Sequence, residues 1–116
     1  MKYMLLIYGD EGAIAHATPE QNQAVADEYE VFTKSIVESG KFLDGDPFLP
    51  TGTSRTIRVQ DGRTEASDGP VVTTDPQLMA YYKVEAESPE EAEQLAARVP
   101  GARYGAVEVR QVVVFD

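Results

Sequence analysis

Apolar and polar positions along this chain show two kinds of pattern, one typical of strands and one typical of helices. Residues 2–9, KYMLLIYG, are an apolar and aromatic run that ends in glycine, as a buried strand does. Residues 77–86 and 105–116 instead alternate from side to side, a period of two that predicts strands. The alternation puts Met79, Tyr81 and Lys83 opposite Ala80, Tyr82 and Val84 in the first of these two segments, and it groups Val107, Val109, Gln111 and Val113 in the second.

Two other segments carry helix start signals followed by apolar residues at helical spacing. TPEQ at 18–21 has a threonine N-cap, proline at the first helical position and glutamine three residues after the cap, which is a capping box. SPEE at 88–91 repeats this signal, while Gly40 and Pro100-Gly101 mark the two helix ends. The predicted buried stripes are Val25, Tyr29, Phe32 and Ile36 in the first helix and Ala92, Leu95, Ala96 and Val99 in the second.

Between the two halves, residues 54–67 have the pattern of a β-hairpin. Asp61-Gly62, flanked by strand-forming residues, is a strong short-range hairpin signal. Asp68-Gly69-Pro70 follows and supports two interpretations. The three residues make a stiff turn by their backbone preferences, or the turn holds the Asp68 carboxylate in a cleft at the sheet edge.

The order strand, helix, strand, hairpin, strand, helix, strand predicts an α+β fold. Two split β-α-β units in one small domain give a ferredoxin-like βαββαβ sheet with both helices on one face, here with an inserted hairpin. The other face of the sheet would then expose many apolar residues to solvent. They include Tyr3, Tyr81, Tyr82 and the valines of the last strand. We therefore expect a homodimer with facing sheets.

Composition narrows the classes of protein that this chain can belong to. With 116 residues it suits one domain, and the absence of cysteine excludes disulfides and thiolate chemistry. The net charge of −10 disfavours nucleic acids and anionic membranes as partners. No apolar run reaches the roughly 20 residues of a membrane span, and acidic residues follow the first apolar run where a signal-peptide cleavage site would lie, so a cytoplasmic protein is expected.

Several stretches together resemble the YCII-related family, also called DGPF-domain proteins. They are KYMLLIYGDE at the start, DG followed by DGP, and YYKVEAESPEEAEQLAARVPGARYGAVEVRQV at the end. The resemblance covers residues 1–116 as a single YCII-like domain and implies a ferredoxin-like fold that dimerises into a barrel-like α/β assembly. The chain departs from the family run D-G-P-F-A-E-T-K-E, since it reads DGPVVTTDPQ at 68–77. After DGP, the acid, the lysine and the final acid of the family run are absent here, and only Asp75 lies nearby.

His16 is the candidate catalytic residue. It is the one histidine of the chain, and its side chain ordinarily titrates near neutral pH. His16 is close in sequence to Asp10, and if the loop folds back, Asp10 or the distant Asp68 orients the imidazole as a general base. The resemblance points the same way, since some relatives in the family are proposed to act through a His-Asp pair. The alternative is an exposed histidine in the loop before the first helix.

Arg58, Tyr82 and Arg103 are the candidate ligand-binding residues. Arginine suits an anionic ligand, and a tyrosine hydroxyl can donate a fixed hydrogen bond. In the alternative interpretation Tyr82 packs in the core or an interface, and the arginines pair with surplus carboxylates. No metal-ligand spacing, nucleotide-binding glycine motif or serine-hydrolase elbow is present, so neither a metal nor a cofactor is expected.

The sequence thus leads to one function and one alternative. The first is a small YCII-like protein that binds a small molecule in a cleft near the dimer interface, with acid–base chemistry by His16 and an aspartate as an open option. The alternative is a dimeric binding or accessory module without catalysis. The sequence does not decide whether the protein is an enzyme.

Overall fold

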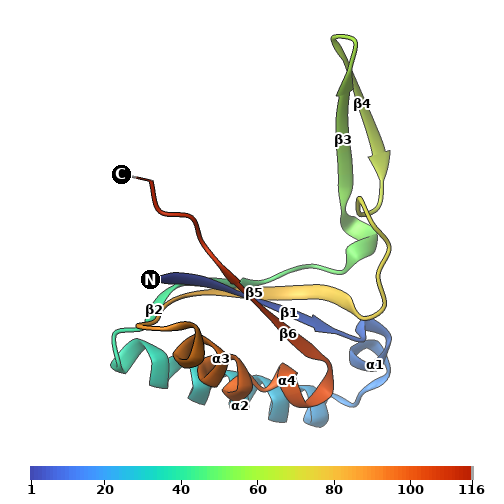
Figure 1. The fold of residues 1–116 in the computed structure, drawn as a ribbon. Coiled ribbons are helices and arrows are strands. Elements are labelled where there is room, and N and C mark those ends of the chain that lie inside the picture. The colour runs from blue at the N-terminus through green and yellow to red at the C-terminus, as the bar shows by residue number, and fades with distance from the viewer. Residues whose placement is uncertain (116) are drawn as a thin grey trace.

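Four antiparallel strands form the main sheet, in the order β2-β5-β1-β6 (Figure 1). The computed structural model describes residues 1–115. Along the chain these residues form β1 (Lys2–Gly9), α1 (Glu11–His16), α2 (Pro19–Glu38), β2 (Phe42–Pro47), the short 3-10 turn η1 (Thr51–Thr53), β3 (Arg55–Gln60), β4 (Arg63–Asp68), β5 (Gln77–Glu85), α3 (Pro89–Arg98), α4 (Gly101–Tyr104) and β6 (Ala106–Gln111). The order confirms the ferredoxin-like α+β fold with an inserted hairpin.

The two long helices begin at the residues that their start signals indicate. In α2 the Thr18 hydroxyl accepts from the Gln21 backbone N–H at 3.1 Å, and the Gln21 side chain accepts from the Thr18 N–H at 2.9 Å. In α3 the Ser88 hydroxyl accepts from the Glu91 N–H at 3.1 Å. Both predicted N-caps are confirmed, and each satisfies a backbone donor that the first helical turn cannot.

Helices α2 and α3 cover one face of the sheet and enclose the core there (Figure 1). Leu5 from β1, Ile36 from α2, Val84 from β5 and Val99 after α3 are its largest fully buried side chains. Tyr3 and Tyr82 also lie in this core, at 2% and 8% exposure. The expectation that both belong to the surplus of the uncovered face is therefore wrong for these two tyrosines, because strand alternation turns them toward the helices.

Residues 11–16, expected as a loop, form the short helix α1. Asp10 is its N-cap, and the Asp10 carboxylate accepts from the Gly12 N–H at 2.8 Å. Asp10 followed by Glu11 is a helix-start signal, but six residues offer no apolar periodicity from which to predict a helix.

The hairpin β3–β4 makes its own two-stranded sheet and stands away from the main one (Figure 1). Asp61 and Gly62 both have positive φ, 50° and 75°, which is the backbone of the predicted two-residue turn. At the other end of the chain the last strand is shorter than expected. It ends at Gln111, and the expected strand residues 112–115 lie outside it, while Asp116 is outside the described residues.

The second face of the main sheet carries none of the helices of residues 1–115 (Figure 1). Tyr3, Leu5 and Ile7 are in the core. Strand alternation therefore places the side chains of the intervening β1 residues on the second face. Tyr81 of β5 lies there too, beside two carboxylates of β2. We call this side of the sheet the open face.

No helix within residues 1–115 has both the length and the apolar character to cross a bilayer.

Candidate functional site

A cavity of about 410 Å³ opens at the end of the sheet where β1 finishes and β6 starts. We call it the end hollow. Its polar side chains are those of Tyr8, Asp75 and Glu108, together with Thr74. A phenol and two carboxylates beside apolar walls can hold a small molecule by both burial and hydrogen bonds. The remaining lining residues are Pro76, Ala106 and Val107.

Strand pairing and one glycine hold Tyr8 against the start of β6. Tyr8 lies opposite Ala106 across the β1–β6 pair. A Cβ atom at Gly105 would come within 2.1 Å of the Tyr8 carbonyl oxygen, so only glycine permits this close approach. Glu108 lies on the same stretch of β6, where the Arg110 guanidinium donates to its carboxylate at 2.7 Å. The lining residues of β1 and β6 are therefore set by rigid strands.

The loop from 69 to 76, which contributes Asp75 to the lining of the hollow, is tied at both ends. At its start the Gly69 N–H donates to the Ser54 carbonyl at 2.8 Å, and the Thr56 hydroxyl donates to the Gly69 carbonyl at 2.7 Å. At its end the Gln77 side-chain amide donates to the Thr74 carbonyl at 3.4 Å. The backbone of the Asp68-Gly69-Pro70 turn thus anchors one end of the loop that lines the end hollow.

A polar network joins α1, η1 and β5 at this same end of the sheet. The Glu11 carboxylate accepts from the Thr51 N–H at 2.8 Å and from the Thr51 hydroxyl at 2.7 Å. The Glu11 N–H donates to the Gln77 side-chain oxygen at 3.0 Å. Three segments far apart in the sequence are fixed around the end of β1 in this way.

A second polar group lies on the open face, at β2. The Tyr81 hydroxyl donates to the Asp44 carboxylate at 2.9 Å and lies 3.5 Å from that of Asp46. The hydrogen bond to Asp44 raises the pKa of Tyr81, because ionised Tyr81 would place a negative charge beside a carboxylate. The Phe48 ring stacks on Tyr81 with centroids 5.8 Å apart. This group is not among the residues predicted from the sequence, although the alternation in FLDGDP and in β5 is a signal for it.

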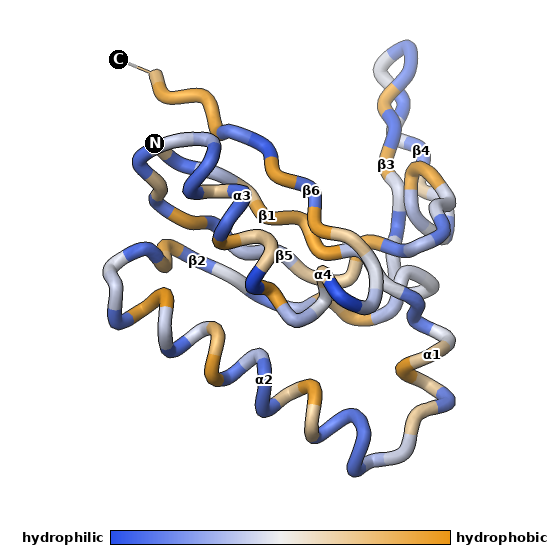
Figure 2. The backbone as a smooth tube through the Cα atoms, turned by 60° about the horizontal axis from the view of Figure 1, so that its bottom comes forward, coloured by the Kyte–Doolittle hydropathy of each residue, from blue (hydrophilic) through white to orange (hydrophobic). Residues whose placement is uncertain are grey.

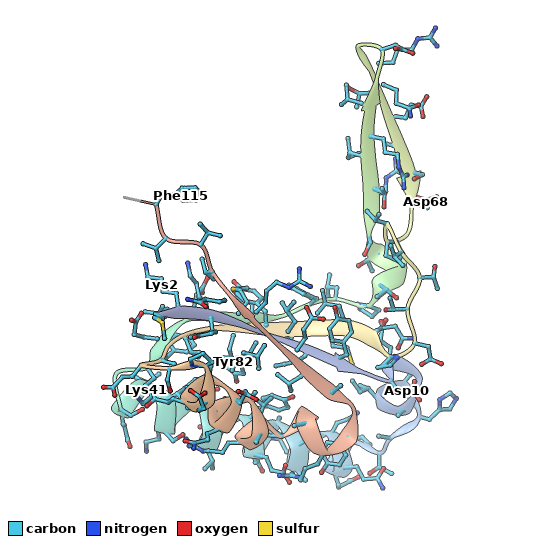
Figure 3. All side chains as sticks on the ribbon, viewed as in Figure 1. Lys2, Asp10, Lys41, Asp68, Tyr82 and Phe115 are labelled. Carbon is cyan, nitrogen blue, oxygen red and sulfur yellow. The ribbon has the colours of Figure 1, made fainter. Side chains whose placement is uncertain are left out.

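His16 lies in the last turn of α1 and is exposed, and its ring Nδ1 is 2.7 Å from the Gly12 carbonyl of the same helix. Among residues 1–115, no ion pair joins His16 to a carboxylate. Asp10 caps α1 at its start, whereas Asp68 is in the hairpin, paired with Arg55 (Figure 3). The structure does not bring the three predicted catalytic side chains together, and their catalytic role stays a prediction.

Arg58, Tyr82 and Arg103 also lie in three separate places. Arg58 is in β3 of the projecting hairpin, opposite Glu65. Tyr82 is in the core, where its hydroxyl and that of Thr33 are 2.6 Å apart, and burial raises its pKa. Arg103 is in α4 and forms an ion pair with Glu28. Tyr82 and Arg103 thus have the core and ion-pair positions of the alternative interpretation, and their role as ligand-binding residues stays a prediction.

A larger cavity, about 590 Å³, lies on the helical side of the sheet between α3, α4 and β6. Alanine and valine side chains dominate its lining, and Glu93 and Gln111 are the polar exceptions apart from Tyr3. Within residues 1–115 no group of three or more histidine, aspartate or glutamate side chains is placed to hold a metal ion. The end hollow is the better candidate, because a phenol and two carboxylates line it.

Three comparisons connect this geometry to known proteins. The model of the YCII-related domain matches residues 1–116. An uncharacterized protein of Rhizobium meliloti (strain 1021), R00369, is 29% identical over 117 residues, which cover 99% of this chain and 94% of that protein. Among solved structures, 5-chloro-2-hydroxyhydroquinone dehydrochlorinase (TftG) from Burkholderia phenoliruptrix AC1100, in complex with 2,5-dihydroxybenzoquinone, has a similar fold. The TM-score is 0.59 at 15% identity, covering 97% of this chain and 94% of that chain.

Proposed function

Because this chain belongs to the YCII-related domain family, we propose that it is a homodimer that binds a small molecule in the end hollow. The observation that carries the proposal is the convergence of Tyr8, Asp75 and Glu108 on one cavity of about 410 Å³ at the edge of the open face. Concave sites with apolar walls and a few converging polar groups are the usual form of small-molecule sites.

The open face supports the dimer part of the proposal. Met4, Leu6 and Tyr8 alternate with the buried residues of β1, so each is on the open face of the sheet. A two-fold axis parallel to the sheet would stack the two open faces and remove this apolar strip from water. Such stacking is the barrel-like pairing that the family resemblance implies, and it would cover the mouth of the end hollow, which is otherwise wide.

The charges of the hollow favour a particular class of ligand. Two carboxylates and a phenol accept hydrogen bonds, so a ligand with hydroxyl or amine donors fits them. An anionic ligand is disfavoured, because the hollow has no basic lining residue and the chain carries a net charge of −10. The solved dehydrochlorinase of this fold was captured with 2,5-dihydroxybenzoquinone, which makes small hydroxylated rings the first compounds to test.

A thermal-shift screen with neutral hydroxylated rings, small amines and small carboxylates tests the binding proposal. A compound that binds only the folded state raises the melting temperature. We expect stabilisation by members of the first two classes, lost in Glu108→Gln and reduced in Tyr8→Phe. Glu93→Gln, in the other cavity, is the matched control and should respond as the wild type does. Stabilisation by carboxylates alone, or equal responses of Glu108→Gln and wild type, would overturn the assignment of this site.

One observation favours the second candidate function, a dimeric binding or accessory module without catalysis. The Asp10 carboxylate caps α1, and His16 contacts a carbonyl of its own helix, so neither is arranged as a base with its orienting acid. His16→Ala separates the candidates once a ligand is found. Unchanged turnover of that ligand in His16→Ala would remove the histidine from the chemistry, whereas loss of turnover with retained binding would restore it.

A further inference from the structure

The hairpin β3–β4 has one apolar and one polar side. Ile57 and Val59 alternate with Thr56 and Arg58 along β3, and the cross-strand partner of Ile57 is Ala66. Alternation of this kind is typical of a strand that buries one face. In the single chain nothing covers that face, because Ile57 is 58% and Val59 is 67% exposed.

The hairpin also projects from the main sheet and pairs with none of its strands (Figure 1). Its strands pair only with each other, and an isolated two-stranded hairpin is marginally stable at best in water. The radius of gyration is 16.2 Å, while a compact domain of this length has one of about 13 Å. The difference reflects segments that stand away from the body, and the hairpin is one of them (Figure 1).

A second apolar segment stands away from the sheet at the opposite end. We call residues 112–115 the tail. The tail follows β6, and its last tie to the sheet is the Val112 N–H, which donates to the Lys2 carbonyl at 2.8 Å. Val113, Val114 and Phe115 are 69%, 67% and 89% exposed. Figure 2 shows the tail as a continuous hydrophobic stretch, and Figure 3 places Phe115 on the same side of the sheet as the hairpin.

We propose that in the homodimer the apolar side of each hairpin packs against the tail of the second copy. This inference rests on the proposed homodimer with stacked open faces. The hairpin and the tail rise from opposite ends of the open face (Figure 1). A two-fold axis that runs across the strands therefore brings the hairpin of one copy beside the tail of the other, twice in each dimer.

The alternative axis runs along the strands and brings hairpin to hairpin and tail to tail. It would bring the charged side chains of two identical hairpins together, whereas the tail of residues 112–115, VVVF, has no charged side chain to set against them. In the hairpin-to-tail arrangement residues 55–68 bring three basic and three acidic side chains to a partner whose own excess is negative. The hairpin has no net charge, so its approach meets no net repulsion from the partner.

The chain has no cysteine, so cross-linking through introduced cysteines is unambiguous. Val59→Cys and Val113→Cys are made in two chains that differ by a mass tag, mixed to exchange subunits, and treated with a short bismaleimide. The expected product is a covalent dimer that contains one chain of each kind. Gln60→Cys, on the polar side of the hairpin, is the matched control, and its mixture with Val113→Cys should give at least several-fold less product.

Three results would contradict the contact between hairpin and tail. Cross-linked dimers of Val59→Cys with itself would show hairpin against hairpin and contradict it. A mixture that sediments as a dimer and yields no mixed product would also overturn the hairpin-to-tail contact, while the homodimer stands. A protein that sediments as a monomer at all concentrations would remove both the homodimer and this contact.

Discussion

The two faces of the main sheet differ in how completely one chain covers them. On the helical face Leu5, Ile36 and Val84 are fully buried. On the other side rise the hairpin and the tail, whose large apolar side chains are mostly more than half exposed. Both sides have the same alternating strands, so the difference lies in the coverage and not in the pattern. The helical face is thus closed within one chain, whereas apolar side chains on the other side stay exposed, as the proposed homodimer requires.

A substitution in the core under the helical face should have the largest effect on stability. Leu5→Ala should lower the free energy of unfolding by about 2–5 kcal/mol, because it leaves a cavity in a closed core. Denaturant unfolding at several protein concentrations measures this. The loss should be the same at each concentration, and a loss well under 1 kcal/mol would show that this core is not close-packed.

Ile57→Ser tests the opposite side. Burying an isoleucine side chain is worth about 1.5–3 kcal/mol, so the proposed dimer should dissociate at least tenfold more readily while the fold of each chain is kept. Sedimentation equilibrium with circular dichroism measures both properties. Gln60→Ser, on the polar side of the hairpin, is the control. Equal dissociation constants of Ile57→Ser and wild type would mean that the hairpin side is not an interface.

A substitution at the N-cap of α2, on the helical face, should have a smaller effect on stability than one in the core. Thr18→Ala removes the hydroxyl that accepts from the Gln21 N–H and should cost about 1 kcal/mol of unfolding free energy. Thr73→Ala, at an exposed loop position, is the matched control and should change it by less than about 0.5 kcal/mol. If both variants lose the same amount, the capping box contributes nothing measurable.

A smaller effect, in pH dependence, comes from the ion pair between Lys41 and Glu91, whose atoms are 2.7 Å apart. The hydrogen bond from Lys41 lowers the pKa of Glu91. A lowered pKa in the folded state gives stability that is present above the ordinary pKa and lost as the pH falls through the folded one. Wild type should therefore exceed Glu91→Gln in melting temperature near neutral pH, and the gap should close below about pH 4. A gap independent of pH would contradict this.

The sequence predicts local features of the fold well and features of the site poorly, for a physical reason. Capping at Thr18 and Ser88 and the turn at Asp61-Gly62 depend on neighbours within four residues, and all three are confirmed. The short helix α1 was missed because its six residues are too few for a periodic signal. The last strand is predicted too long for a different reason. Its alternating pattern continues past the point where pairing with β1 ends.

The candidate site depends on contacts between distant segments. Tyr81 meets Asp44 only through the register of β2 on β5, and Tyr8 and Asp75 line one cavity only through the loop that Gly69 anchors. Neither register nor loop path can be read from single residues. His16 attracted attention by its chemistry alone, whereas the cavity is formed by residues that have ordinary chemistry and converge in space.

The proposed dimer requires that the open face is a surface between two copies of this chain. Sedimentation equilibrium of the wild-type protein tests it most directly, because it measures mass independently of the extended shape. We predict a species with twice the chain mass of 12.7 kDa at micromolar concentrations. A single species of 12.7 kDa at every concentration tested would contradict the claim.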